Sequence, residues 1–76
     1  MANLRMDRVT IGRNIRLRRK DLELTQSDVA NQIGMNRWAL ANVEKGRTSL
    51  PLESAKPIVE ILRLKSIESL FNPLWE

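Results

Sequence analysis

Apolar and polar residues follow one another along the chain in a pattern typical of short amphipathic helices. Near the start, Ile11, Ile15 and Leu22 recur on one face at helical spacing, with Arg18 between them. The spacing predicts a first helix that Thr10 caps and that runs to about Leu22. The aliphatic stem of Arg18 can lie along the apolar face while its charge reaches water.

The next two helices are expected on either side of a tight turn. Thr25 and Asp28 form a capping-box pattern, which predicts the start of a second helix. That helix should stop at Gly34, because glycine suits the left-handed position after a helix. Asn36 is expected to cap a third helix, over about residues 36–45, that ends at Gly46.

The last part of the chain predicts two more helices. A loop over residues 47–51 should lead to a fourth helix that starts near Glu53 or Ser54, so that Pro57 falls in its first turn. Ser66 is expected to cap a short fifth helix through Phe71. The side chains that we expect the fourth helix to carry inward are Leu52, Ile58, Ile61 and Leu62.

No segment shows the alternation of a strand, so the sequence predicts an all-α fold. We expect a compact bundle of five short helices in which the second and third form a helix-turn-helix. The 76 residues allow one domain at most. Its expected parts are a flexible basic arm over residues 1–9, the helix-turn-helix domain over residues 10–71 and an apolar tail over residues 72–76.

Composition excludes several classes of function. The chain has no Cys, His or Tyr, no glycine-rich phosphate loop and no inward-facing acid pair, so we expect neither an enzyme nor a metal or cofactor. No apolar run approaches the roughly 18 residues that a membrane span needs. The N-terminus also lacks the apolar centre of a secretory signal, so we expect a cytoplasmic protein without a membrane partner.

Charge is concentrated at one end of the chain. The net charge is +4, and residues 1–20 hold seven basic residues against Asp7 alone, a balance of +6. A positive patch of this kind suits a polyanion such as nucleic acid. It is equally typical of a solvated helix face, and charge alone does not choose between the two.

The segment LTQSDVANQIGMNRWALANVEKGRTSL resembles the core of the Cro/C1-type (XRE) helix-turn-helix proteins. The matching residues, in order and at the family's spacing, are Arg19, Thr25, Gln26, Val29, Ala30, Gly34, Leu40, Val43, Glu44 and Gly46. The resemblance covers about residues 11–71. It implies a lambda-repressor-like domain that binds double-stranded DNA, as a dimeric repressor on a palindromic operator. Glu23 stands where the family usually has glycine, so we expect a strained turn there.

The resemblance places the third helix in the major groove, with its first residues at the base edges. Helical geometry then turns Arg37, Trp38, Ala41 and Asn42 outward as the expected base contacts. Arg37 can pair with guanine and Asn42 with adenine. The ring of Trp38 can press against a thymine methyl group, or it can fold back over the second helix and cover core.

Phosphate contacts are expected around both helices of the motif. The N-terminus of the second helix presents free amides to an anion, and the resemblance implies that Gln26 binds phosphate. The expected phosphate contacts are Thr25, Gln26, Asn36, Lys45, Arg47, Thr48 and Arg16. The resemblance also implies a partly buried, structural salt bridge between Arg19 and Glu44.

The C-terminal sequence LFNPLWE gathers the apolar residues Leu70, Phe71, Leu74 and Trp75. This surface can form a homodimer, whose two units would meet successive turns of the groove. It can also bind a toxin protein, because the sequence is similar to HipB-type antitoxins, which repress their own operon and hold a kinase toxin inactive. The third possibility is that the tail packs on its own core.

Overall fold

Helices make up all the regular structure in the part of the chain, residues 8–70, that the computed structural model describes. The α-helices are α1 (Arg8–Asp21), α2 (Gln26–Ile33), α3 (Arg37–Glu44) and α4 (Ala55–Ile61). The 3-10 helix η1 (Leu52–Ser54) precedes α4, and η2 (Ile67–Leu70) follows it. The predicted all-α class is confirmed. The expected fifth helix is a 3-10 turn within the described residues, so four α-helices build the fold.

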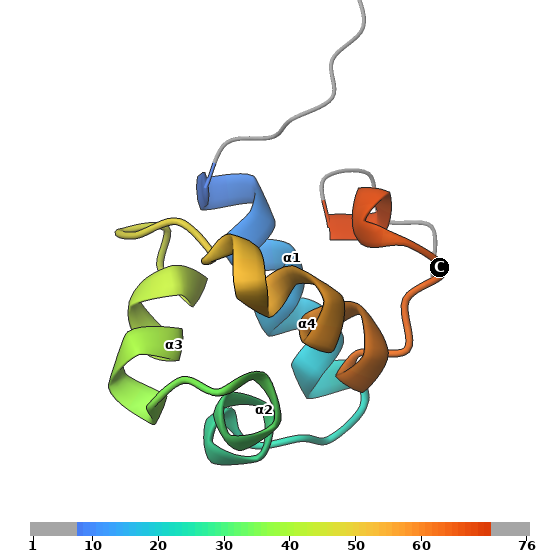
Figure 1. Ribbon diagram of the computed structural model, residues 1–76, viewed down its shortest axis with the longest axis horizontal. Helices are drawn as coiled ribbons and strands as arrows, with labels where there is room; N and C mark the ends of the chain where they lie inside the picture. Colours follow the sequence, from blue (N-terminus) through green and yellow to red (C-terminus); the bar gives the residue numbers. More distant parts are fainter. Residues whose placement is uncertain (1–7, 71–76) are drawn as a thin grey trace, which may run out of the picture.

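The helices surround one apolar core (Figure 1). In this view α3 and α2 lie on the left and at the bottom, and α1 passes behind α4. α1 packs against α3, while α2 packs against both α3 and α4. The buried apolar residues are Ile15, Val29, Ala30, Ile33, Leu40, Val43, Ile58, Leu62 and Leu70.

Local hydrogen bonds fix the starts of α2 and α3, as the sequence predicts. Thr25 Oγ1 accepts from the Asp28 amide at 3.0 Å, and Asp28 Oδ2 accepts from the Thr25 amide at 2.9 Å. Gly34 ends α2 in the left-handed region with φ 74°. Asn36 Oδ1 then accepts from the Ala39 amide at 2.7 Å. Because each bond satisfies a group that a helix end leaves unpaired, the short turn holds α2 and α3 in a defined arrangement.

Two details of the predicted elements are wrong. α1 begins at Arg8, so Thr10 lies inside the helix and is not its cap, and Arg8 and Val9 are helical rather than part of the arm. Leu52 is 88% exposed, because η1 turns Ser54 inward in its place. The predicted end of α3, by contrast, is confirmed, since Lys45 is the C-cap after Glu44 and Gly46 follows in the left-handed region with φ 77°.

The turn after α1 holds the strain that the sequence predicts at Glu23. Its φ is 60°, in the left-handed region that glycine adopts freely. The Glu23 amide donates to Lys20 O at 3.0 Å, and the Leu24 amide donates to Arg19 O at 3.0 Å. This is the Schellman arrangement that ends many helices, and it costs roughly 1–2 kcal/mol with a side chain at the left-handed residue.

Arg18 has a role that its sequence position did not reveal. Its Nε donates to the Leu62 carbonyl at 2.9 Å, and its Nη1 pairs with Asp21 Oδ2 at 3.0 Å. Leu62 is the C-cap of α4, where carbonyl groups lack partners within the helix. Arg18, on the apolar face of α1, therefore caps the C-terminal end of α4.

None of the helices among residues 8–70 is long and apolar enough to cross a bilayer.

Candidate nucleic-acid interface

The outer face of α3 carries side chains that the core does not use. Arg37, Trp38 and Lys45 are exposed, and the small Ala41 is half-buried between them. Trp38 is 75% exposed, so its ring does not cover the core over α2. The opposite face buries Leu40 and Val43. The α3 helix is thus fixed by one side while the other side remains open.

Asn42 does not belong to this open face. It was predicted to turn outward, but it is only 9% exposed. It lies in the last turn of α3, where α1 comes so close that Gly12 faces the carbonyl oxygens of Val43 and Glu44. Little of the Asn42 residue is therefore open to a partner, and its contact with adenine stays a prediction.

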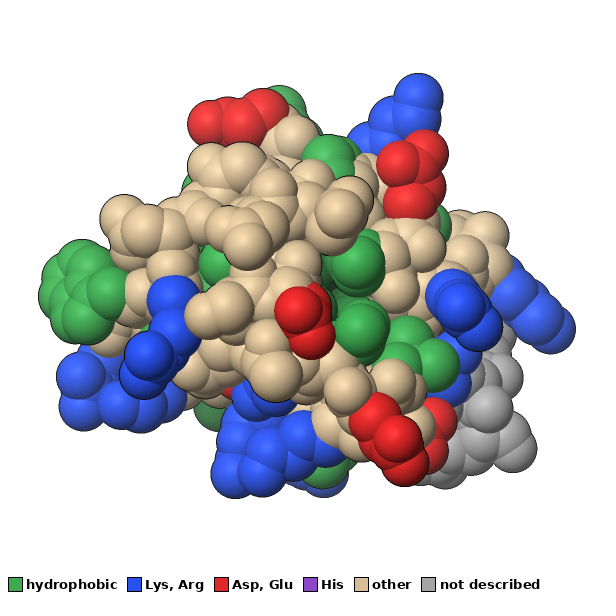
Figure 2. Space-filling view, turned by 90° about the horizontal axis from the view of Figure 1, so that it is seen from below, with side chains coloured by type: hydrophobic (Ala, Val, Ile, Leu, Met, Phe, Trp, Pro, Cys, Tyr) green, Lys and Arg blue, Asp and Glu red, His purple; other side chains and the backbone are tan. Residues whose placement is uncertain are grey.

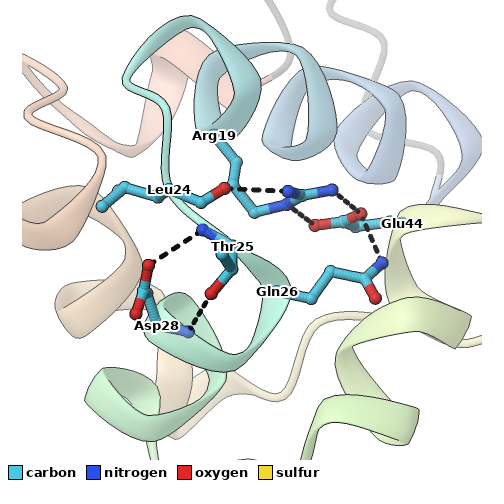
Figure 3. A network of polar contacts seen from close by, with 6 residues as sticks. All are labelled: Arg19, Leu24, Thr25, Gln26, Asp28 and Glu44. Carbon is cyan, nitrogen blue, oxygen red and sulfur yellow. Dashed lines mark hydrogen bonds and ion pairs between the residues drawn. The ribbon is translucent and has the colours of Figure 1, made fainter.

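A buried ion pair joins α1 to the end of α3 (Figure 3). Arg19 Nε donates to Glu44 Oε2 at 2.7 Å, and Arg19 Nη2 donates to Glu44 Oε1 at 3.0 Å. The two side chains are 9% and 1% exposed. Arg19 Nη1 also donates to the Leu24 carbonyl at 2.9 Å. Two parallel charge-assisted bonds fix the relative orientation of the two groups, so the pair ties α3 to α1 and to the loop before α2.

Gln26 is part of the same network (Figure 3). Its Nε2 donates to Glu44 Oε1 at 3.0 Å. An amide nitrogen carries two hydrogens, so one donor of Gln26 remains for a phosphate. A shallow polar hollow, lined by Leu24, Thr25, Gln26, Ser27, Arg19 and Arg37, separates the start of α2 from the start of α3. The Gln26 side chain thus lies beside α3.

Capping limits what Thr25 can offer to a phosphate. Its backbone amide already donates to Asp28, and these hydrogen bonds to the Thr25 backbone and side chain lower the pKa of the Asp28 carboxyl. The Thr25 hydroxyl is engaged as well, because Oγ1 accepts from the Asp28 amide and the side chain also bonds the Asp28 carboxylate. A phosphate contact by the Thr25 side chain would therefore replace its bond to the Asp28 carboxylate.

The other expected phosphate contacts lie on the surface. The exposed residues of this group are Lys45, Arg47 and Thr48 after α3, Arg16 on α1, and Asn36 at the start of α3. Asn36 uses its oxygen to cap α3, which leaves its amide hydrogens free of that role. Figure 2 shows basic side chains along the lower edge and the left, which is the α3 end, with hydrophobic surface beside them on the left.

Two residues of α1 that position other helices were not predicted from the sequence. Gly12 lets α1 approach the α3 backbone closely, and the Asn14 side chain donates to the Leu70 carbonyl, which fixes η2 against α1. The sequence does hold one signal for the close approach, which is Gly12 itself. A glycine inside a helix costs about 0.5–1 kcal/mol relative to alanine, so its presence indicates that a larger side chain does not fit there.

A helix-turn-helix family model matches residues 15–70, which is most of the chain. The chain belongs to this family, the Cro/C1-type (XRE) helix-turn-helix proteins. The family consists of DNA-binding transcriptional regulators.

Relatives of this Cro/C1-type protein include an uncharacterized HTH-type transcriptional regulator of Methanothermobacter thermautotrophicus. It is 40% identical over 57 residues, which cover 75% of this chain and 83% of the relative. The restriction-modification controller protein C.AhdI from Aeromonas hydrophila has the same fold, with a TM-score of 0.76, 26% identity and coverage of 86% of this chain and 97% of that chain. The P22 c2 repressor protein, solved with a synthetic operator, gives a TM-score of 0.74 and 26% identity over 80% of this chain and 91% of that chain. These matches do not distinguish the HipB-type branch, so the antitoxin alternative stays a prediction.

The C-terminal part of this Cro/C1-type domain corrects one interface prediction. Leu70 is 1% exposed and packs in its own core, so it is not free to contact a partner. Phe71, Leu74 and Trp75 lie outside the described residues. Beside Leu70 is an open apolar groove of about 300 Å³. Its apolar lining comprises Ile11, Leu50, Pro51, Leu52, Ala55, Ile67 and Leu70.

Proposed function

We propose that this protein regulates transcription in the cytoplasm by binding a specific duplex DNA sequence with α3 in the major groove. The observation that carries the proposal is the open face of α3, where Arg37, Trp38 and Lys45 are exposed and have no part in the core. An α-helix fits the major groove, and the base edges there differ for every base pair. The capped α2–α3 turn supports the proposal because it presents α3 rigidly.

The proposed base contacts are Arg37, Trp38 and Ala41. The guanidinium of Arg37 has the donors for a two-bond contact with guanine, and such a contact is worth about 1–3 kcal/mol of discrimination. Trp38 and Ala41 offer apolar surface to methyl groups. The proposed phosphate contacts are Gln26, the Thr25 hydroxyl, Asn36, Lys45, Arg47, Thr48 and Arg16, which give affinity without sequence information.

Two arginines of different proposed role test this division. Arg37→Ala should lower discrimination at one base pair of each half-site by roughly 5-fold to 150-fold. Arg47→Ala should weaken binding to all duplexes about equally and reduce the salt slope by about one. Quantitative binding to a set of single-base operator variants measures both effects, with Lys56→Ala on α4 as the control for loss of one exposed charge. Equal, sequence-independent losses for Arg37→Ala and Arg47→Ala would contradict the assignment.

We further propose that two copies of the chain form a dimer on a palindromic operator. Each copy would bind one half-site, and the dimer would act as a repressor. The apolar groove beside Leu70 supports this, because its rim exposes 88% of Leu52 and 38% of Ile67. The occupant that we propose for this groove is a second copy of the chain, since twofold pairing places two reading helices on successive turns of the groove.

Leu52→Asp should therefore abolish pairing and leave the fold intact, because the side chain is exposed and carries no core contact. Sedimentation equilibrium of the wild type and of Leu52→Asp measures the change, and Leu17→Asp on the exposed face of α1 is the matched control. A Leu52→Asp chain that pairs as tightly as the wild type would exclude this groove as the interface.

A further inference from the structure

The open face of α3 carries few side chains that can form hydrogen bonds with base edges, and much of its surface is apolar. Asn42 carries the one amide side chain of α3, and it is only 9% exposed, so it adds little hydrogen-bonding surface to this face. Arg37 remains as the polar reader of the first turn, and Lys45 follows the last turn. Trp38 and Ala41 supply the surface between them. Readout by this face should consequently depend on guanine and on methyl groups.

Helix geometry brings Arg37, Trp38 and Ala41 together. Ala41 follows Trp38 by three residues and Arg37 by four, and residues at these spacings are neighbours on a helix surface, with Cβ atoms about 5–6 Å apart. The small side chain of Ala41 lets base edges approach the helix. Successive base pairs rise by about 3.4 Å, so Arg37 and Trp38 can contact neighbouring base pairs.

The surroundings of Trp38 indicate a DNA contact rather than a protein contact. Its neighbour Arg37 is exposed, and Arg37 lines the polar hollow at the start of α2 together with Gln26. Lys45 lies exposed at the far end of the same helix. An apolar ring between positive charges suits a polyanion that carries methyl groups in its groove.

Apolar contact with the indole ring of Trp38 does not discriminate between thymine and 5-methylcytosine. Both bases carry a methyl group on C5 that projects into the major groove. They differ at the neighbouring polar group, which is an acceptor in thymine and a donor in cytosine. Apolar contact with the ring reads the methyl group and ignores that difference.

We propose that Arg37 and Trp38 together read a guanine next to a C5-methylated pyrimidine, and that 5-methylcytosine replaces thymine there without loss. Cytosine methylation of DNA then creates or strengthens binding sites for this protein. The inference rests on the proposed function, because it requires α3 to lie in the major groove.

The experiment uses the best-bound duplex from a selection on random DNA. Each pyrimidine of the half-site is varied in two matched pairs, thymine against uracil and 5-methylcytosine against cytosine, so that each pair differs only by the methyl group. At one position the methyl group should strengthen wild-type binding by about fourfold in both pairs, the effect of one buried carbon group. Thymine and 5-methylcytosine should bind within about threefold of each other at that position.

Three variants separate the roles. Trp38→Ala should bind both members of each pair equally and keep its melting temperature, since the ring is 75% exposed. Arg37→Ala should keep the methyl effect and lose the preference for guanine at the neighbouring base pair. Leu17→Ala, which removes an exposed apolar side chain of α1, should change neither.

A wild-type protein that is indifferent to the methyl group at every position would overturn the inference. So would a preference for thymine over 5-methylcytosine as large as that for thymine over cytosine. In both cases the selected duplex would still be bound in preference to shuffled DNA, and the proposed function would stand. Failure to prefer the selected duplex at all would instead overturn the proposed function.

Discussion

Replacing Gly12 with alanine is expected to lower the melting temperature by more than about 10 °C, at roughly 4–8 °C per kcal/mol for a domain of this size. A Cβ atom at this position would lie 2.0 Å from the Val43 carbonyl oxygen and 3.0 Å from that of Glu44. Both are backbone atoms of α3, so neither can rotate away. Overpacking typically costs about 1–3 kcal/mol, and a clash between two helix backbones should reach or exceed the upper value.

Gly34→Ala is the matched control for Gly12→Ala. A Cβ atom on Gly34 would meet no other atom within 4 Å, and the φ of 74° costs a side chain there only about 1–2 kcal/mol. Thermal unfolding followed by circular dichroism compares the two variants. If Gly12→Ala melts above Gly34→Ala, the close approach of α1 to α3 is not present in solution. The comparison also bears on function, because the same contact sets the place of the reading helix.

Glu44→Ala is expected to cost about 3–5 kcal/mol, because it leaves the Arg19 guanidinium buried without its partner. The side chains of Arg19 and Glu44 are 9% and 1% exposed, so water cannot replace the lost carboxylate. A single core in a domain of this size rarely supplies more than about 3–5 kcal/mol, so much of the protein should unfold near 37 °C. Urea denaturation measures the change in the free energy of unfolding.

Two variants show whether the charge itself is responsible for the loss in Glu44→Ala. Gln26→Ala removes only the 3.0 Å bond to Glu44 Oε1 and should cost about 1 kcal/mol. The double variant Arg19→Met/Glu44→Leu removes both charges and should be more stable than Glu44→Ala. A Glu44→Ala protein as stable as Gln26→Ala would contradict the buried pair.

The features that the sequence predicts well are those that neighbouring residues decide. The Thr25–Asp28 capping box and the Asn36 cap are closed within a single helical turn, so their side chains alone are enough to predict them. Gly34 ends α2 for a similarly local reason, since few residues other than glycine adopt its φ easily.

The predictions for Asn42 and Leu52 failed because they depend on contacts between distant segments. Asn42 has the spacing of an outward residue but is only 9% exposed, in the turn of α3 that α1 approaches closely. Leu52 is apolar and was therefore expected in the core. In η1 it is Ser54 that points inward instead, where its hydroxyl donates to Ile33 O at 3.3 Å. The contact of Arg18 with Leu62 likewise spans two helices and has no local signal.

If α3 reads a specific duplex sequence, the protein should distinguish a selected duplex from a shuffled duplex of the same composition. The measurement is the dissociation constant for each duplex over a series of salt concentrations. We expect the selected duplex to bind at least about 1,000-fold more tightly near physiological salt. Both affinities should fall with salt, by about 0.9 log units per log unit of salt for each phosphate contacted. Equal affinity for the two duplexes at every salt concentration would contradict sequence-specific binding by α3.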